Sequence, residues 1–426
     1  AVLVRLLIKN GIVVSEELGG EKKADILIEN DKIIKIAEQI DDENDQVLDV
    51  EGLYVLPGFI DMHCAVCDPG HESVEDIETV SMSAAAGGFT TITAQPDTQP
   101  AVDNKTVVEY IITKSKEYAD VNILPYGSMT LGCKGERISE IGEMVHAGIV
   151  GIADGDLTVG NAEIMRNIFV YSKMFDMPVI THCEDMALSG KGVINEGRVS
   201  TQLGLLGIPR EAEDIIVARN IVLAENAGAR LHIAHVSTKG AVRLIKAAKK
   251  RGVNLTCDTC PHYFTVTEDV AMNYNTYAKV IPPLRTDSDI KAIAEGVADG
   301  TIDVISSGHA PTRKEFKQRE FDTAAYGISA LETAFALSYT ELVKNGVITM
   351  SELVNRLSEK PAKVLGLNTK GKLAVGYDAD ITIADCGEEY VIDAEKFYSK
   401  AKFTPVHGRK VCGRIKHTMV GGKIIL

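Results

Sequence analysis

The two ends of the chain share one pattern, in which short apolar runs alternate with turn signals. In the first part we expect strands at 3–7, 11–14, 25–28, 32–36 and 47–50, separated by turns such as Asn10-Gly11 and Asn30-Asp31. The last part repeats the pattern, with strands expected at 379–384, 414–415, 417–420 and 423–426. Because chain termini often lie close together, the pattern predicts one composite β-sandwich made of residues 1–53 and 376–426.

Between these ends an apolar strand is followed by an amphipathic helix, and this unit recurs along the chain. The strands are expected at 55–64, 90–95, 121–128, 148–154, 178–183, 230–236, 253–259 and 302–307, and helices at 103–117, 161–175, 211–226 and 239–250 among others. Buried strands that alternate with helices indicate a parallel sheet covered on both faces. Residues 54–375 are therefore predicted to form an α/β fold, a TIM-type (β/α)8 barrel, with its functional side chains at the C-terminal ends of the strands.

Composition narrows the classes of partner. The chain has 426 residues with 45 Lys and Arg against 60 Asp and Glu, a formal net charge of -15. Such a surface repels phosphate backbones and anionic lipid, so we expect neither a nucleic acid nor a membrane partner. The eight cysteines are few for a disulfide framework, and the apolar N-terminus is interrupted by Arg5 and Lys9. We expect reduced thiols and a cytoplasmic protein.

Residues that bind metals gather at the ends of the predicted strands. They are His63, Asp154, His182, His235 and, just after the last strand, His309. A single histidine in such a place is usually a core residue held by a hydrogen bond. Several at the same end of consecutive strands indicate a zinc-type site, because imidazole and carboxylate are the ligands zinc uses. His262 and Tyr263 follow the seventh strand and could line the mouth of the same barrel, although one histidine beside an aromatic residue is also common in barrels without activity.

At this point the chain resembles a known family. The stretch LPGFIDMHCAVCDPGHE is similar to the opening motif of the dihydroorotases in the cyclic amidohydrolase superfamily, Asp-x-His-x-His-x-Arg-(Glu/Asp)-Pro-Gly. Further matches, among them THCED, LHIAHVSTKGAVRLI, IPPLRTDSD and GISALETAF, extend over nearly the whole chain. The resemblance implies a barrel with a composite β-sandwich, one or two zinc ions in active members, and a place in pyrimidine biosynthesis.

The resemblance also implies the ligand set, and two ligands are missing. His63, Asp154, His182 and His235 stand where the family has ligands. Ala65 replaces the second histidine of the opening motif, and Gly308 replaces the aspartate that serves the family as general base. We therefore expect at most one zinc ion per chain, held by Asp154, His182 and His235 with His63 nearby.

Substrate-holding positions have changed as well. Cys67 replaces the arginine that pairs with the substrate carboxylate in the family, Asp97 replaces an asparagine, and Ile281 replaces a second asparagine. His309, which the resemblance identifies as another carboxylate contact, is retained. A general base contributes roughly 10²–10⁴-fold to a rate, so these losses together predict a catalytic defect.

The cysteines suggest a competing metal site. Cys64 and Cys67 form one CxxC pair, Cys257 and Cys260 another, and two such pairs can hold structural zinc. Successive residues of a strand point to opposite faces, so Cys64 should face away from His63. We expect reduced, buried cysteines rather than a four-cysteine site.

Two functional interpretations remain open. The first is a catalytically defective dihydroorotase homologue that serves as a structural or regulatory subunit, with aspartate carbamoyltransferase or a second copy of itself as partner, as inactive members of the family do. The second is an active zinc-dependent hydrolase of some cyclic amide with a one-metal site.

Overall fold

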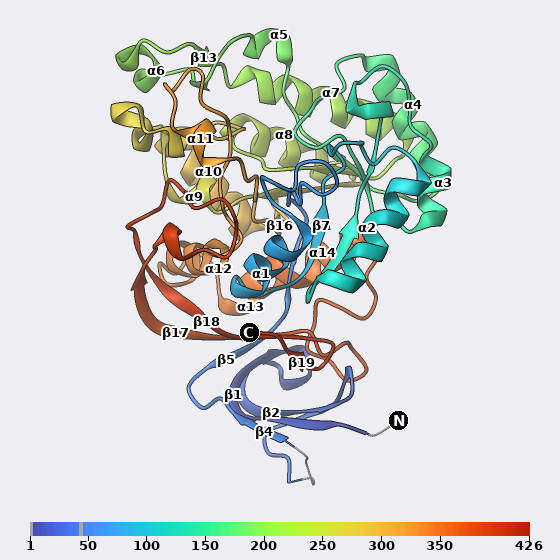
Figure 1. Cartoon of the computed structure of the whole chain (residues 1–426), viewed down its shortest axis with the longest axis vertical. Coiled ribbons are helices and arrows are strands. Elements are labelled where there is room, and N and C mark those ends of the chain that lie inside the picture. The colour runs from blue at the N-terminus through green and yellow to red at the C-terminus, as the bar shows by residue number, and fades with distance from the viewer. Residues whose placement is uncertain (1–2, 42–45) are drawn as a thin grey trace.

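The fold is seen in a computed structural model that describes residues 3–41 and 46–426 (Figure 1). Residues 1–2 and 42–45, which the predicted small domain includes, lie outside the described residues. Strands from both ends of the chain join in one curled eight-stranded sheet, ordered β19-β18-β17-β5-β1-β2-β3, with β4 on β1. Its strands are β1 (Arg5–Ser15), β2 (Gly20–Glu29), β3 (Lys32–Ala37), β4 (Gln46–Asp49), β5 (Tyr54–Pro57), β17 (Ile381–Val391), β18 (Lys410–Val420) and β19 (Lys423–Ile424).

Parallel strands form the second part of the molecule, a (β/α)8 barrel, as predicted. They are β6 (Phe59–Asp61), β7 (Phe89–Ala94), β8 (Asn122–Pro125) with β9 (Gly127–Ser128), β10 (Ile152–Ala153), β11 (Val179–Thr181), β14 (Leu231–Ile233), β15 (Leu255–Thr259) and β16 (Val304–Ile305). Backbone hydrogen bonds from Ala65 to His309 and from Gly308 to His63 close the barrel between its first and last strands. These bonds lie just beyond the C-terminal ends of β6 and β16, the end of the barrel at which functional side chains are expected.

Helices surround the barrel (Figure 1). The longer ones are α1 (Ile77–Ala86), α2 (Lys105–Tyr118), α3 (Ile141–Ala147), α4 (Ala162–Lys173), α7 (Glu211–Ala227), α8 (Lys239–Lys250) and α10 (Asp287–Asp299). Shorter helices are α5 (Met186–Ser189), α6 (Arg198–Leu203), α9 (His262–Thr265), α11 (Lys314–Lys317), α12 (Ala334–Ser338), α13 (Met350–Val354) and α14 (Lys360–Leu365), and a small pair of strands, β12 (Ile194–Asn195) and β13 (Gly207–Ile208), lies outside the barrel. No helix among the described residues is long and apolar enough to cross a membrane.

Helix α8 illustrates how the sequence specifies these elements. Thr238 caps its N-terminus by accepting a hydrogen bond from the Ala241 amide. Val242, Ile245 and Ala248 are buried at spacings of three residues, so one face packs inward. Lys249 and Lys250 end the helix, where cations complement its dipole.

Two predicted features differ in the structure. The expected strand 55–64 is divided: β5 pairs with β1 and β17 in the small sheet, and only β6 belongs to the barrel. Gly58 separates them because a Cβ there would lie 2.1 Å from Thr90 Oγ1. The expected turn at Asn10-Gly11 is instead a bulge within the single strand β1, where Asn10 has φ 64°.

Candidate functional site

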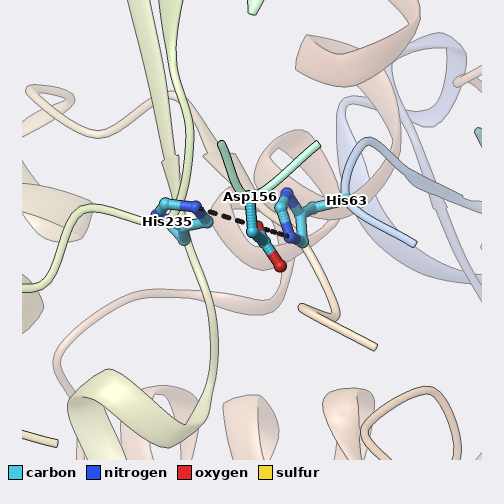
Figure 2. Close-up of side chains that lie close together, drawn as sticks. All are labelled: His63, Asp156 and His235. Carbon is cyan, nitrogen blue, oxygen red and sulfur yellow. Dashed lines mark ion pairs between the residues drawn. The ribbon is translucent and has the colours of Figure 1, made fainter. Parts of the chain in front are cut away.

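Three side chains meet at the C-terminal end of the barrel (Figure 2). His63 follows β6, Asp156 lies in the loop after β10, and His235 follows β14. Asp156 Oδ1 is 3.3 Å from His63 Nε2 and 3.5 Å from His235 Nε2. Donors bound to one tetrahedral zinc at 2.0–2.2 Å lie about 3.4 Å apart, so these distances suit a single ion.

A buried oxygen without a hydrogen bond supports this fit. Asp156 Oδ1 is inaccessible to water and has no hydrogen-bond partner among the described residues. Leaving a buried carboxylate oxygen without a hydrogen bond is costly, and an ion between the three side chains would coordinate it. The donor set of nitrogen and carboxylate oxygen is therefore one that a zinc-type ion would satisfy.

The carboxylate of Asp156 and the imidazole of His63 shift each other's pKa in opposite directions. Burial alone would raise the pKa of Asp156, but the surrounding histidines, His63 foremost, hold that pKa well below its ordinary value. Burial also disfavours charge on His63, yet the carboxylate of Asp156 outweighs it and raises the pKa of His63 to about 9. Burial lowers the pKa of His235. In the absence of an ion, the cluster is thus a His63–Asp156 ion pair beside a neutral His235.

His182 approaches the cluster from β11 and is held by two neighbours. Its Nδ1 lies 2.9 Å from His235 Nε2 and 3.9 Å from Asp156 Oδ1. Its Nε2 lies 2.9 Å from Glu184 Oε2, and Glu184 in turn accepts a hydrogen bond of 2.7 Å from Ser189 Oγ. A carboxylate on one ring nitrogen fixes the tautomer that turns the other nitrogen toward a metal.

Further groups orient the histidines from behind. Gln95 Nε2 lies 3.3 Å from His63 Nδ1, while Gln95 Oε1 has no partner. With the amide reversed, Gln95 Oε1 would accept a hydrogen bond from the His63 Nδ1–H group, and the lone pair of His63 Nε2 would stay free for a metal. His235 has φ 40°, unusual for a residue other than glycine, and Asp258 Oδ1 accepts its backbone N–H at 2.9 Å. Backbone strain of this kind is typical of functional sites.

The predicted ligand Asp154 lies outside the cluster, and Asp156 takes its place. Asp154 Oδ1 accepts hydrogen bonds from the Met129 and Thr130 amides, and Oδ2 accepts one from Thr130 Oγ1. Strand β10 ends before Asp154, and Gly155 then turns the chain with φ 65°. Because of that turn, the side chain of Asp156 rather than that of Asp154 lies at the mouth of the barrel.

The predicted substrate-holding residues do not gather in one pocket. Ile281 lines the cavity beside the cluster, whereas Cys67 and Asp97 do not. His309 is fully buried: its Nε2 lies 3.1 Å from Glu75 Oε2, and its Nδ1 accepts from the Ala330 amide. With both ring nitrogens engaged, His309 has none left for a substrate carboxylate.

The cavity itself is small. It measures about 60 Å³ and is lined by the three cluster residues together with Cys260, His262, Tyr263, Ile281, Gly308, Tyr326 and Ile328 among others. His262 and Tyr263 both line this cavity, one of the two possibilities that the sequence left open. Burial lowers the pKa of His262 to about 3, so its imidazole is neutral.

Gly308 sits in this wall with φ 70°. A Cβ at this position would lie 2.6 Å from Cys260 Sγ and 2.9 Å from His262 Cε1. All eight cysteines are free, and the residues in the described ranges that could group around a metal are His63, Asp156 and His235, without a cysteine.

Sequence reasoning missed Asp156 and Glu184. The stretch ADGDLTV contains two acids two residues apart, and only the glycine between them hinted at a turn. Glu184 stands two residues after His182 in THCED, a spacing at which a side chain can return to the histidine. That spacing was the available signal for it.

Comparison with known proteins places this site in a family context. A family profile described as Dihydro-orotase-like matches residues 52–241, and one described as Amidohydrolase family matches residues 325–426. The dihydroorotase of Caldanaerobacter subterraneus subsp. tengcongensis is 49% identical over 421 residues, covering 99% of this chain and 97% of its own. That of Acetivibrio thermocellus is also 49% identical, covering 99% of both chains.

Solved structures resemble the fold over its whole length. The L-hydantoinase (dihydropyrimidinase) from Arthrobacter aurescens matches with a TM-score of 0.89 and 29% identity, covering 99% of this chain and 95% of its own. The dihydropyrimidinase from Brevibacillus agri matches with a TM-score of 0.87 at 24% identity, a likeness of fold alone, and it covers the same 99% and 95%. The small sheet and the barrel therefore occur together in these proteins too.

Proposed function

We propose, from the premise that this chain belongs to the dihydroorotase family, that it has lost dihydroorotate hydrolysis and serves as a structural or regulatory subunit. The observation that carries the proposal is Gly308. The family motif has its general base at this position, and here no side chain is present to accept a proton. The atoms nearest to a Cβ at Gly308 would belong to Cys260 and His262, and Asp156, the acid that lines the same cavity, is engaged with His63 and His235.

The size of the cavity supports the same conclusion. Pockets for small ligands typically measure about 300–1,000 Å³. The space beside His63, Asp156 and His235 is about 60 Å³, enough for a few water molecules. Tyr326 and Ile328 are part of its wall. A ring the size of dihydroorotate would need this wall to move.

We infer one zinc ion per chain. His63, Asp156 and His235 form one set of donors, while Asp156, His182 and His235 form an overlapping set. Both sets require Nε2 of His235, and a ring nitrogen has one lone pair to give. The two sets therefore cannot each hold an ion. In an active relative such an ion supplies Lewis-acid polarisation and an acidic bound water.

The direct test is an assay of the purified chain with dihydroorotate and, in reverse, with carbamoyl aspartate. We expect no turnover above background, because Gly308 cannot accept a proton and Cys67 cannot pair with a carboxylate. The combination Ala65→His, Cys67→Arg, Asp97→Asn and Gly308→Asp is the smallest change that could restore it. Ordinary steady-state turnover by the unmodified chain would overturn the proposal.

Metal content is the second test. After dialysis, elemental analysis should give at most one equivalent of zinc, and Asp156→Asn should remove it. Asp154→Asn, a change of the same kind at the acid outside the cluster, is the matched control and should retain the ion. Two equivalents in the native chain would contradict the single-ion proposal.

The retained cluster favours one alternative. Each of the two overlapping donor sets has three members, and three protein ligands with one open position suit an active hydrolase of some other cyclic amide with a one-metal site. A screen of cyclic amides with the zinc-loaded chain separates the two candidates. Zinc-dependent hydrolysis that disappears in His235→Gln supports the alternative and rejects the structural role.

A partner follows from the structural role. We propose association with aspartate carbamoyltransferase or with a second copy of this chain, in the cytoplasm, where eight free cysteines would stay reduced. The support is analogy with inactive family members. Co-purification from the native source and sizing at micromolar concentration test it. A solitary monomer without carbamoyltransferase in the eluate rejects both partners.

A further inference from the structure

Another cavity lies in the C-terminal part of the molecule, where α12 packs against β18 (Figure 1). It measures about 280 Å³ and is bordered by residues of α12, β17 and β18 and by the single helical turn Ala394–Lys396. It shares no lining residue with the cavity at the barrel mouth among the described parts of the chain. Its size approaches the roughly 300–1,000 Å³ that is typical of sites for small ligands.

Glu332 lines this cavity with one carboxyl oxygen paired and the other unpaired. Its Oε2 accepts hydrogen bonds from Ser83 Oγ at 2.8 Å, from the Tyr398 amide at 2.9 Å and from the Ser399 amide at 3.4 Å. Its Oε1 accepts none from any residue in the described ranges, yet that oxygen is not sealed from water. Oε1 is therefore an acceptor that a ligand in the cavity can reach.

The three hydrogen bonds fix the orientation of this carboxyl group. Ser83 belongs to α1, whereas the amides of Tyr398 and Ser399 belong to the segment after β17, so the donors come from two separate parts of the chain. A carboxyl group held in this way loses little conformational freedom when a ligand binds to its other oxygen.

The strongest cation in the lining already has its own partners. The guanidinium of Arg414 lies over the ring of Tyr390, with Cζ 4.1 Å from the ring centroid. Its Nε is 2.8 Å from Glu388 Oε1. Arg414 is therefore neutralised by Glu388, which leaves the carboxyl group of Glu332 without a guanidinium partner.

The two lysines nearby are engaged as well. Lys396 lines the cavity and its Nζ lies 3.9 Å from Asp393 Oδ2, the other acid of the lining. Lys402 acts on Glu332 through its charge, but its ammonium group donates to the backbone carbonyl of Phe397. The unpaired group at this cavity is thus an acceptor, so a complementary ligand must supply a donor.

The rest of the wall suits an apolar body. Phe335, Ile392 and Phe397 line the cavity and are buried, and Tyr390 and Tyr398 add two more rings. Aromatic rings pack well against apolar groups, and their faces also attract cations.

We propose that this cavity binds a small organic cation, a primary amine with an aromatic or branched apolar body, whose ammonium group donates to Glu332 Oε1. A charged donor on a carboxylate makes a stronger hydrogen bond than a neutral donor does. The proposed site lies outside the metal cluster and goes beyond the proposed function.

Protonation of Glu332 gives the proposal a measurable signature. Burial outweighs the three hydrogen bonds on Oε2 and raises the pKa of Glu332 to about 7. An ammonium group at Oε1 favours the ionised carboxylate, so binding of the amine near neutral pH releases a proton. Affinity for a cation should therefore rise as pH increases through about 7.

Calorimetric titration of the purified chain with benzylamine is the direct test, and benzyl alcohol, which has the same body without the charge, is the control ligand. We expect benzylamine to bind at least about tenfold more tightly than benzyl alcohol at pH 8. Because benzylamine stays protonated at both pH values, its affinity should fall about tenfold at pH 6, where Glu332 is mostly neutral. Equal affinities for the two ligands at pH 8 would overturn the proposal.

Two variants locate the contact. Glu332→Gln should weaken benzylamine binding at pH 8 by at least about tenfold and remove the pH dependence. Asp393→Asn is the matched control, since it changes the other acid of the lining in the same way and its amide oxygen can still accept from the Glu395 amide. It should bind as the native chain does. A Glu332→Gln variant that binds within about twofold of native would reject Glu332 as the partner.

Two measurements on the native chain cover a variant that folds poorly. Titration at pH 7 in buffers with different heats of ionisation should show release of about half a proton for each benzylamine bound. Crystals soaked with 4-bromobenzylamine should show anomalous scattering from bromine inside the cavity, with the amine within hydrogen-bonding distance of Glu332. Binding without proton release, or bromine at another site, would reject the proposal.

These outcomes are independent of the proposed function. Dihydroorotate turnover by a chain that binds benzylamine through Glu332 would reject the proposed loss of activity and leave the amine site standing. A chain without turnover that binds benzylamine no better than benzyl alcohol would do the reverse.

Discussion

At the scale of single residues, the space around position 308 decides which side chain the site can accept there. Gly308 has φ 70°, a backbone conformation that residues with a side chain rarely adopt, and a Cβ there would lie only 2.6 Å from Cys260 Sγ. The neighbours have therefore adjusted to glycine. Reintroducing an acid at this position meets two obstacles, backbone strain and overlap with a buried thiol.

We expect Gly308→Asp to destabilise the chain by about 3 kcal/mol and to restore no hydrolysis, because strain and overpacking each contribute about 1–3 kcal/mol. Gly408→Asp is the matched control: Gly408 has φ 81° with nothing within 4 Å of a Cβ, so it should lose only about 1 kcal/mol. Urea unfolding of both variants measures the difference. Equal losses would show that the contact with Cys260 is unimportant.

Glu184 is a second residue whose effect can be measured. We expect Glu184→Gln to reduce zinc affinity about 10–100-fold, because the amide orients the His182 ring less strongly than a carboxylate does. Glu163→Gln, on the exposed first turn of α4, should leave affinity unchanged. Chelator competition measures both. An unchanged affinity in Glu184→Gln would mean that the His182 ring is held by packing alone.

The residue scale is also where sequence reasoning had its limits. His63, His182 and His235 could be predicted because strand ends in a barrel converge by topology. Asp156 could not, since the choice between it and Asp154 depends on the turn at Gly155 and on the Met129 and Thr130 amides that capture Asp154. Those amides are distant in sequence, and their positions follow from the tertiary fold.

At the scale of elements, periodicity located the barrel strands and the long helices closely but did not show which sheet each strand joins. The apolar run at 55–64 reads as one strand, yet Gly58 divides it between two sheets, and its amide donates to Asp380 O. Strands β5 and β6, on either side of Gly58, are both largely buried, so hydrophobicity alone does not reveal the division. The partner strands β17 and β7, which make the difference, lie far away in sequence.

We expect Gly58→Ala to destabilise the chain by about 1–3 kcal/mol, because the added methyl would overlap Thr90, which is 1% exposed and cannot move aside. Gly160→Ala is the control, since nothing lies within 4 Å of a Cβ there. Thermal or urea unfolding compares the two. A Gly58→Ala variant as stable as its control would show that Thr90 is free to shift.

At the scale of the whole molecule, Glu332 links the barrel to the C-terminal part of the chain. It precedes α12, accepts hydrogen bonds from Ser83 Oγ at 2.8 Å and the Tyr398 amide at 2.9 Å, and so ties α1 to the segment after β17. Burial raises the pKa of Glu332 to about 7. The folded chain therefore holds this proton more tightly than the unfolded chain does.

Stability should consequently fall as pH rises. The contribution of Glu332 is fully present below its ordinary pKa of 4.5 and is lost as pH rises through about 7, by up to 1.4 kcal/mol per unit. Urea unfolding at pH 5.5 and 8 should show a smaller difference in Glu332→Gln than in the native chain. Glu395→Gln, exposed near the same segment, should keep the native difference. Identical pH profiles in all three would contradict the prediction.

The small sheet has a consequence for the chain as it leaves the ribosome. Strand β5 finds its antiparallel neighbour β17 only after more than three hundred further residues, which at about 5–20 residues per second takes roughly 15–65 s. During synthesis the nascent N-terminal strands present an open β5 edge, with the apolar Val55 and Leu56 beside it, to other chains. Yield in a cell should therefore depend on holdase chaperones during translation, even though the finished sheet is closed on that side.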